Sequence, residues 1–411
     1  MAVVLLALGS RGEAQPMAVL GGALAQQGTD ATVVALRDYA DLVERQGARF
    51  VPIEAGIADP VESTRGGLGR LAVRHPAGQG WLLADWTRRI APLVADAVLA
   101  AVRHGDTVLS GVLTRPVADA LAEGRGCRAA TLLFTAQAPT LQRESHFFAR
   151  YFTRFQPWNR WGVGFNWRVA TGLGTAVGAE VRRRLGLPRG PRVDAAHAAI
   201  LAASPTLVPP APDWPAWHHQ TGFLAAPERP FTPDSALAAF LAGGEAPVFV
   251  GFGSMAGSLG HRSLATIVEA ADRAGVRVVT PVVPGDAPGE AAPGVFATGP
   301  VPHGWLFGRM AGVVHHGGAG TTHDGLRSGR PSLAIPFGVD QPYHAWRLER
   351  LGVGPAPVPI TRLRPDRLAT RLGELVGTPA YARRAAEVGE AVRAEDGVGA
   401  TLALLDRLGL T

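Results

Sequence analysis

The 411-residue chain is 47% hydrophobic and has a mean hydropathy of +0.11, which fits a globular chain long enough for two domains with cores of their own. No apolar run reaches the roughly 18 residues that cross a bilayer, so no stable membrane insertion is expected. The formal net charge of +6 comes from arginine without lysine, and no run of five basic residues occurs, so no nucleic-acid partner is expected.

Short apolar segments alternate with segments of helical period along the first half of the chain. The predicted strands are Val3–Leu8, Asp30–Leu36, Gly47–Ile53, Val108–Val112 and Arg128–Phe134. The predicted helices are Pro16–Gln27, Trp81–Arg103, Pro116–Glu123 and Val181–Leu187. This alternation is typical of a parallel sheet wound by crossover helices. The apolar N-terminus lacks a basic segment before it and is predicted as a strand, not a signal peptide; with one cysteine, Cys127, the default location is cytoplasmic.

Aromatic residues are dense between His146 and Trp167, in a chain with only 7% aromatics. They are Phe147, Phe148, Tyr151, Phe152, Phe155, Trp158, Trp161, Phe165 and Trp167. One interpretation is an amphipathic helical pair that plugs the core. The other is a wall for an apolar ligand, because such pockets are lined mostly by aromatic and aliphatic side chains.

Proline-rich segments mark a change of domain near the middle of the chain. The first, Val208–Pro215, begins the connection, and Pro227–Pro233 reads as a linker. We therefore expect an N-terminal domain over residues 1–223 and a C-terminal domain over 224–395. Residues 396–411 are expected as a C-terminal helix that can pack back on the N-terminal domain.

The second half repeats the alternation and contains the most informative turn. The sequence His315–Thr321 is HHGGAGT, which follows a predicted strand, Met310–Val314, and precedes a predicted helix, Thr322–Gly329. Glycines let backbone N–H groups approach a ligand closely, and a helix N-terminus favours anions. The same pattern also occurs as tight packing in ordinary α/β proteins. A second polar turn, Pro336–Pro342, favours a diphosphate at the first turn and a hydroxylated ring at the second.

These motifs resemble those of the bacterial branch of family 1 glycosyltransferases, which includes antibiotic glycosyltransferases and sterol 3-β-glucosyltransferase-like proteins. The resemblance covers nearly the whole chain. Gly9–Pro16 is similar to the family's GSRGD-x-QP loop. Its other landmarks are Leu185–Pro188, Asp213–Pro215, Thr221–Phe223, Gly251–Met255, HHGGAGTT at 315–322 and Gly338–Pro342. The resemblance implies a GT-B fold, two Rossmann-like α/β domains facing each other across a cleft. It also implies that the N-terminal domain, residues 1–223, binds the acceptor and that the C-terminal domain, residues 224–395, binds the nucleotide sugar.

The resemblance also implies an inverting, metal-independent transfer of a hexose from a UDP- or dTDP-sugar, with no further cofactor. His315 would contact the diphosphate, and Asp340 and Gln341 would bind the sugar hydroxyls, with Val301 near the nucleobase. Further donor contacts are expected from Gly317, Gly318, Gly320, Thr321, Ser10, Arg11 and Ser254. The aromatic that some relatives stack on the base is Pro300 here, which leaves uracil or thymine open. The intact Asp–Gln pair favours a glucose-type donor.

The general base is where the sequence departs from its relatives. Many carry an N-terminal histidine, but the first histidine here is His75, and Glu13 stands where others carry aspartate. A carboxylate can act as a base if an apolar pocket raises its pKa. The alternative is a loop acid paired with Arg11. His146 is a second candidate, with Asp106 and Asp119 behind it.

The predicted acceptor is a bulky apolar natural product such as a polyketide, macrolide or sterol-like alcohol. Two alternatives remain at this stage. One is a catalytically silent protein of the same fold that binds a partner enzyme, and the other is a nucleotide-sugar 2-epimerase. The expected partners are the small-molecule acceptor and the sugar-nucleotide donor, and a homodimer is compatible with the prediction.

Overall fold

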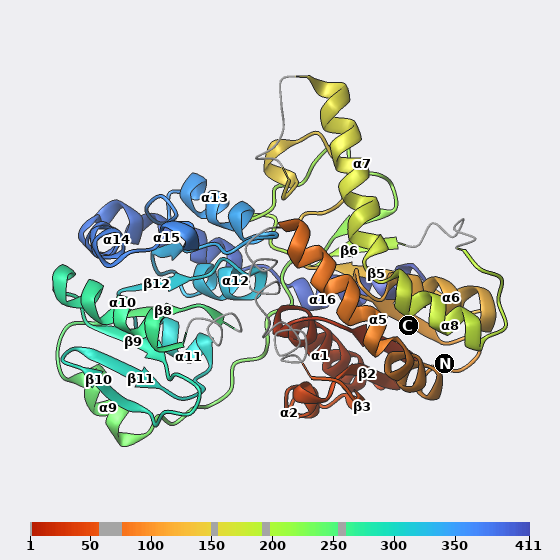
Figure 1. The fold of residues 1–411 in the computed structure, drawn as a ribbon, viewed down its shortest axis with the longest axis horizontal. Coiled ribbons are helices and arrows are strands. Elements are labelled where there is room, and N and C mark those ends of the chain that lie inside the picture. The colour runs from red at the N-terminus through yellow and green to blue at the C-terminus, as the bar shows by residue number, and fades with distance from the viewer. Residues whose placement is uncertain (1, 57–75, 149–154, 191–197, 254–259) are drawn as a thin grey trace. The chain divides into compact units, whose positions relative to one another are not determined.

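The computed structural model describes residues 2–56, 76–148, 155–190, 198–253 and 260–411. The chain forms two compact units, one of Met1–Ala226 with Asp396–Thr411 (unit 1) and one of Pro227–Glu395 (unit 2). Each has a mainly parallel sheet with helices around it (Figure 1). The prediction of two α/β domains is therefore confirmed. Among the described residues, no helix is both long and apolar enough to cross a membrane.

Unit 1 is built on a seven-stranded parallel sheet in the order β3-β2-β1-β4-β5-β6-β7. Its strands are β1 (Val3–Ala7), β2 (Ala31–Leu36), β3 (Arg49–Ile53), β4 (Thr107–Ser110), β5 (Arg128–Leu133), β6 (Ala198–Leu201) and β7 (His218–Gln220). Its helices are α1 (Arg11–Gln26), α2 (Ala40–Glu44), α5 (Pro76–Ala101), α6 (Arg115–Arg125), α7 (Gln156–Gly172), α8 (Thr175–Arg184) and α16 (Gly397–Arg407). The central strands β1, β2 and β4 are buried along their whole length, as expected of a sheet covered on both faces.

Unit 2 has a six-stranded sheet in the order β10-β11-β9-β8-β12-β13, in which β10 is antiparallel to β11 and the other pairs are parallel. Its strands are β8 (Val248–Gly251), β9 (Val278–Pro281), β10 (Gly289–Ala292), β11 (Val295–Thr298), β12 (Gly312–His315) and β13 (Ser332–Ala334). Its helices are α9 (Ser235–Ala242), α10 (Gly260–Ala274), α11 (His303–Phe307), α12 (Ala319–Arg327), α13 (Gln341–Leu351), α14 (Pro365–Gly377) and α15 (Pro379–Arg393).

The strand order reverses once in each sheet. In unit 1 the reversal lies between β1 and β4, and in unit 2 it lies between β8 and β12. At such a switch point the connections leave in opposite directions, so a crevice opens at the carboxyl ends of the two strands. The turns after β1 and β12 are those that the sequence singled out.

The C-terminal helix α16 belongs to unit 1. Leu404 and Leu405 are buried in the core that surrounds β1. The hydroxyl groups of Thr401 and Thr221 form a hydrogen bond, with 2.7 Å between the oxygens. Unit 1 is thus closed by a segment that comes from the far end of the chain.

Helix α1 begins earlier than the sequence pattern predicts. Pro16 suggests a helix start, yet the helix begins at Arg11 and keeps the proline inside it. The N–H groups of Glu13 and Ala14 both donate to the carbonyl of Ser10, which starts the first turn. As a result, Glu13 lies in a helical turn rather than in a loop.

Candidate active site

Glu13 occupies the switch point of unit 1. Its carboxylate lies against Gly9, which follows β1, and Gly111, which follows β4. A Cβ atom on either glycine would overlap a carboxylate oxygen of Glu13. Thr114 donates its hydroxyl proton to the Leu6 carbonyl and accepts from the Gly111 N–H, which ties the second loop to β1. Two glycines therefore make the space that this side chain fills.

The surroundings of Glu13 change its acidity. Burial raises the pKa of its carboxyl from 4.5 to about 7, although the backbone at Leu8 lowers it somewhat. The Oε1 atom is buried and has no hydrogen-bond partner among the described residues. Arg11 instead donates to the side chain of Gln15, at 3.0 Å. The site thus holds a carboxylate that can accept a proton near neutral pH, as a general base must.

The other candidate bases have different surroundings. His146 is fully buried, and its Nδ1 accepts the N–H of Phe148 at 3.1 Å. Burial lowers the pKa of this histidine to about 4. Asp106 accepts the N–H groups of Ala2 and Arg103 directly before β4 begins. It therefore lies at the amino ends of the strands, whereas Glu13 lies at their carboxyl ends. Of Glu13, His146 and Asp106, Glu13 is the one that the fold places at the switch point, and Asp119 lies on α6, the helix that follows β4.

In unit 2, His315 is the last residue of β12 and pairs in register with Gly251 of β8. Its Nδ1 accepts the N–H of Gly317 at 3.0 Å, so the other ring nitrogen, Nε2, carries the proton. Burial and neighbouring histidines lower the pKa of His315 well below its usual value, which keeps the ring neutral. The Nε2 atom is buried beneath α12, 3.9 Å from where a Cβ atom on Gly325 would lie.

His316 is the second histidine of the glycine turn, to which the sequence assigned no separate role in the donor site. Its ring lies between Gly253, which follows β8, and Gly318; a Cβ atom on Gly253 would be 2.7 Å from the ring. Burial lowers the pKa of His316 to about 4. Because successive side chains of a strand point to opposite faces, His315 and His316 cannot occupy the same place. The contacts of His316 with Gly253 and Gly318 place its ring beside the carboxyl ends of β8 and β12.

The N-terminus of α12 is open toward a ligand. Gly318 is its N-cap residue and supplies no side-chain hydrogen bond, so the first N–H groups of the helix lack the usual cap. No atom would lie within 4 Å of a Cβ atom on Gly320. Thr321 is partly exposed in the same turn. This arrangement can bind an anion by N–H groups and the helix dipole.

The Asp340–Gln341 turn lies beside this helix. Gln341 accepts the N–H of Phe337 through its side-chain oxygen at 2.8 Å, which leaves its amide NH2 group as a donor. The carboxylate of Asp340 is 19% exposed and lies 3.8 Å from Nδ1 of His344. A carboxylate acceptor and an amide donor on adjacent residues can together bind neighbouring hydroxyl groups.

Gly317 joins the two turns. Its φ of +85° is in the region that favours glycine, and a Cβ atom there would lie 3.0 Å from the carbonyl oxygen of Gln341. Nδ1 of His344, in α13, donates to the Gly317 carbonyl at 2.8 Å. The structure therefore brings His315, Gly317 and Gln341 together.

The remaining predicted donor residues are placed as follows. Val301 packs against the Phe249 and Phe307 cluster just before α11. In α11, Nδ1 of His303 bonds the carboxylate of Asp324 at 2.9 Å, which ties the expected nucleobase segment to α12. Ser10 and Arg11 are exposed at the start of α1 in unit 1. Ser254 lies outside the described residues.

A strained residue stands directly before Asp340. Val339 has a φ of +54° and is the one non-glycine residue with positive φ among those the structure describes; its side chain is 73% exposed. Such strain in a branched residue often accompanies a functional turn.

Replacing Val339 by asparagine should raise the free energy of unfolding by about 1 kcal/mol, because asparagine tolerates this backbone conformation far better. The branched Val339→Thr variant keeps the strain and should match the original chain. Thermal melting of the three proteins measures the difference. An asparagine variant no more stable than the threonine variant would contradict the prediction.

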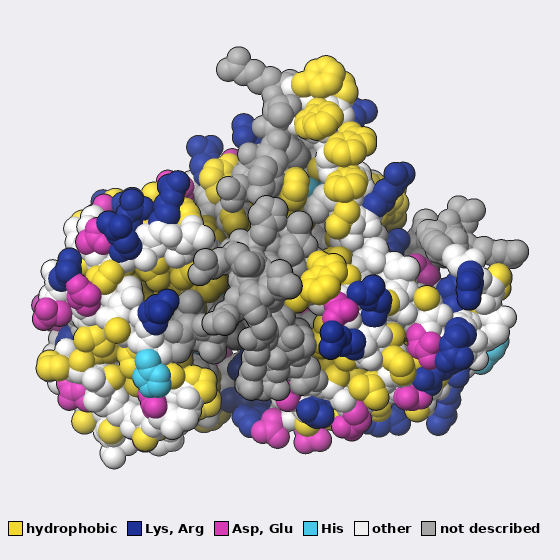
Figure 2. Space-filling model, viewed as in Figure 1, with side chains coloured by type: hydrophobic (Ala, Val, Ile, Leu, Met, Phe, Trp, Pro, Cys, Tyr) yellow, Lys and Arg dark blue, Asp and Glu magenta, His cyan; other side chains and the backbone are white. Residues whose placement is uncertain are grey.

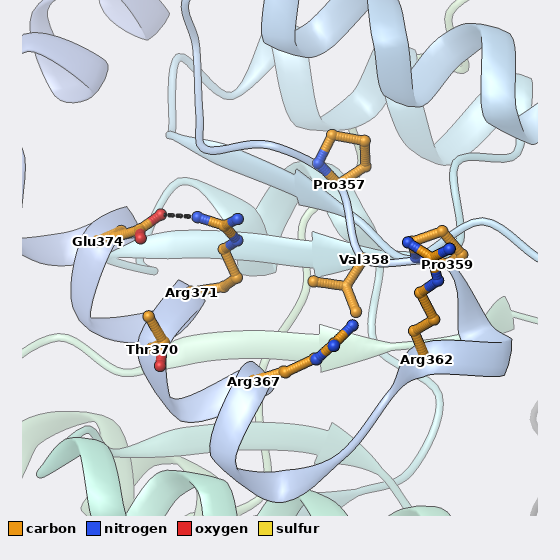
Figure 3. A pocket seen from close by; sticks show the side chains of 8 residues that line it. All are labelled: Pro357, Val358, Pro359, Arg362, Arg367, Thr370, Arg371 and Glu374. Atoms are coloured by element: carbon orange, nitrogen blue, oxygen red, sulfur yellow. Dashed lines mark hydrogen bonds and ion pairs between the residues drawn. The ribbon is translucent and has the colours of Figure 1, made fainter.

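A hollow in unit 2 is lined by residues outside these turns. Figure 3 shows it between the segment before residue 360 and one face of α14. Its volume is about 340 Å³, and it is lined by Pro357, Val358, Pro359, Arg362, Arg367, Thr370, Arg371 and Glu374. Arg371 bonds Glu374. None of these residues belongs to the turns described above.

Within the described ranges, no group of three or more histidine, cysteine, aspartate or glutamate residues is arranged to hold a metal ion.

Comparison with known sequences finds relatives along the whole chain. Residues 278–397 match the family described as erythromycin biosynthesis protein CIII-like, C-terminal domain. O-mycaminosyltylonolide 6-deoxyallosyltransferase of Streptomyces fradiae is 30% identical over 428 residues, which cover 99% of this chain and 97% of that protein. Vancomycin aglycone glucosyltransferase of Amycolatopsis orientalis is 40% identical over 217 residues, about half of each chain. A sterol 3-β-glucosyltransferase of Pichia angusta is 29% identical over 96% of this chain and 32% of its own length.

Solved structures share the fold over nearly the full length. The glycotransferase of kitacinnamycin has a TM-score of 0.67 at 22% identity and covers 99% of this chain and 98% of its own. The glycosyltransferase VinC, solved in complex with dTDP, has a TM-score of 0.64 at 21% identity and covers 99% of each chain. The two sheets and their order thus have the arrangement of the GT-B fold.

Proposed function

The chain belongs to the family 1 glycosyltransferases of the GT-B fold, and we propose that it transfers a hexose from a UDP- or dTDP-sugar to a hydroxyl group of a bulky apolar natural product. The observation that carries this proposal is the uncapped N-terminus of α12 at the switch point between β8 and β12. The relatives support it, because one is named for transfer to O-mycaminosyltylonolide and another for transfer to the vancomycin aglycone. The bound dTDP of the VinC structure supports the donor class.

We assign the donor to unit 2. The N–H groups of Gly318, Gly320 and Thr321 face the diphosphate, with the neutral ring of His316 beside it, and the buried His315 holds the turn through its bond to the Gly317 N–H. Asp340 accepts from sugar hydroxyls, and the amide NH2 of Gln341 donates to them. The nucleobase lies near Val301. These donors stabilise the charge that collects on the leaving diphosphate without needing a metal ion.

We assign the base to Glu13. The acceptor hydroxyl gives its proton to the Glu13 carboxylate, and its oxygen forms a bond to the anomeric carbon of the sugar. The bond from that carbon to the diphosphate oxygen breaks, and the nucleoside diphosphate leaves with the electron pair. Attack from the side opposite the leaving group inverts the anomeric configuration.

The apolar acceptor is supported by α7. Trp158, Trp161 and Phe165 are 57%, 59% and 54% exposed and recur at helical spacing, with ring centroids 5.2 and 5.1 Å apart. Figure 2 shows this row of hydrophobic side chains along the helix. Asn159 and Val163, on the opposite side of α7, are buried. A core plug would bury the row, whereas a wall for an apolar ligand leaves it open.

Trp161→Ser should raise the KM for an apolar acceptor about tenfold, because the ring's share of buried apolar area is worth on the order of 1.4 kcal/mol. The KM for the sugar nucleotide should stay unchanged. Trp81→Ser is the matched control, since Trp81 is 59% exposed on α5, outside the row. Steady-state kinetics with both substrates varied measures the effect. Equal acceptor KM values in the two variants would remove α7 from the acceptor site.

The test of the function is incubation with UDP-glucose or dTDP-glucose and a panel of phenolic and macrolide acceptors, read by mass spectrometry. A hexose-sized mass gain on an acceptor supports the proposal, and the NMR coupling at the anomeric carbon reports inversion. Unchanged rates in excess EDTA are expected. Epimerised donor without product would point to the 2-epimerase, and no turnover with any donor would point to a silent binding protein.

A further inference from the structure

We propose that His344 is a positioning residue of the donor site, which locks the peptide group between Gly317 and Gly318 so that its N–H faces the diphosphate. This inference rests on the proposed donor site. His344 has no place in the predicted roles, and its spacing from the HHGGAGTT motif gives no hint of contact. In the structure it is fully buried and lies against the turn.

The contact is a single well-formed hydrogen bond. Nδ1 of His344 donates to the carbonyl of Gly317 at 2.8 Å. The same residue is held in the first turn of α13, where its backbone N–H donates to the carbonyl of Asp340 at 3.2 Å. The imidazole thus connects the helix that carries Asp340 and Gln341 to the turn that leads into α12.

The direction of this bond fixes the direction of an N–H group. In a trans peptide the C=O and the following N–H point to opposite sides. Because the Gly317 carbonyl points at His344, the N–H of Gly318 points away from α13. Gly318 is the N-cap residue of α12, so its N–H belongs to the set that we assign to the diphosphate.

The peptide group between Gly317 and Gly318 needs a contact that fixes its orientation. It joins two glycines, and glycine adopts positive and negative φ with little steric cost, so the group can rotate more easily than its neighbours. A rotated peptide would turn the Gly317 carbonyl oxygen toward the anion and its N–H away. The Gly317 N–H donates to His315, and this bond fixes the peptide group before Gly317. The peptide group between Gly317 and Gly318 is fixed by His344.

The test compares binding of UDP with uridine, and of dTDP with thymidine, by calorimetry. His344→Ala should weaken the two diphosphates about tenfold and leave the nucleosides unchanged, because only the diphosphates need the Gly318 N–H. His344→Asn should keep the affinity within about threefold, because its amide can donate in place of Nδ1–H. In kinetics, the alanine variant should raise the KM for the donor more than it lowers kcat.

A matched control separates this role from a general loss of stability. Thr401→Val removes a buried hydrogen bond of 2.7 Å in unit 1 and should leave all four affinities unchanged. Equal losses for nucleoside and diphosphate in His344→Ala, or an asparagine variant as weak as the alanine variant, would overturn the inference. Wild-type chain that binds UDP or dTDP without transferring sugar would refute the proposed function and leave this inference standing.

Discussion

Glu13→Gln is expected to lower the rate of sugar transfer about a thousandfold, within the range that a positioned general base contributes. Glutamine keeps the shape that fills the space beside Gly9 and Gly111 but cannot accept a proton. Nucleotide binding, which we assign to unit 2, should stay unchanged, so the loss should appear in kcat. Single-turnover rates with saturating donor measure it. Glu54→Gln, on an exposed residue after β3, is the matched control and should transfer sugar normally.

The pH dependence gives an independent check on Glu13. With a pKa of about 7, the carboxyl is protonated and inactive as a base in acid. The wild-type kcat/KM should therefore rise with pH and level off above about 7. The residual activity of Glu13→Gln should lack this rise. If the glutamine variant turned over normally with an unchanged profile, the base would have to be sought elsewhere, with His146 next.

The pH dependence of the free energy of unfolding should reveal the raised pKa of Glu13 without an activity assay. In the unfolded chain the Glu13 carboxyl has an ordinary pKa of 4.5, and in the folded chain about 7. Between these values the folded state binds more protons, so the free energy of unfolding falls as pH rises through that window. The full loss is on the order of 3 kcal/mol, at about 1.4 kcal/mol per pKa unit. Glu13→Gln should therefore be more stable than wild type at pH 8 and equal to it at pH 4.

The architecture was largely predictable from the sequence because the same pattern of apolar strand, turn and helix recurs along the chain. Buried parallel strands are continuous apolar runs, and each ends in a turn with glycine or polar residues, so both sheets and both switch-point turns could be read from the chain. Segments without that pattern were missed. β10, with the sequence GEAA, and β7, with the sequence HHQ, become strands only because an existing neighbour offers a free edge.

The site was predictable where backbone chemistry defines it and not where packing does. The glycine turn and the Asp–Gln pair are visible in the sequence because their residue types are needed at fixed spacing. The fit of Glu13 between Gly9 and Gly111 depends on two strands about a hundred residues apart and could not be read. Nothing local in the sequence shows that α13 buries His344 against Gly317.

Gly317→Ala is expected to weaken binding of the sugar nucleotide about a hundredfold, since a displacement of about 1 Å in a binding site can cost that much. A methyl group at this position is strained by a φ of +85° and would lie 3.0 Å from the Gln341 carbonyl. Relief requires the glycine turn to move away from the Asp340–Gln341 turn. Both the diphosphate and the sugar contacts should therefore be lost together, whereas Asp340→Ala should affect only the sugar.

The matched control for that variant is Gly373→Ala, on the exposed face of α14, where no atom lies within 4 Å of an added Cβ atom. It should stabilise the chain by about 1 kcal/mol through helix propensity and leave nucleotide affinity unchanged. Calorimetry with UDP-glucose and with UDP compares the three glycine and aspartate variants. If Gly317→Ala bound UDP normally and lost only the sugar, the two turns would act separately. The Gly317 peptide would then no longer be the junction of the donor site.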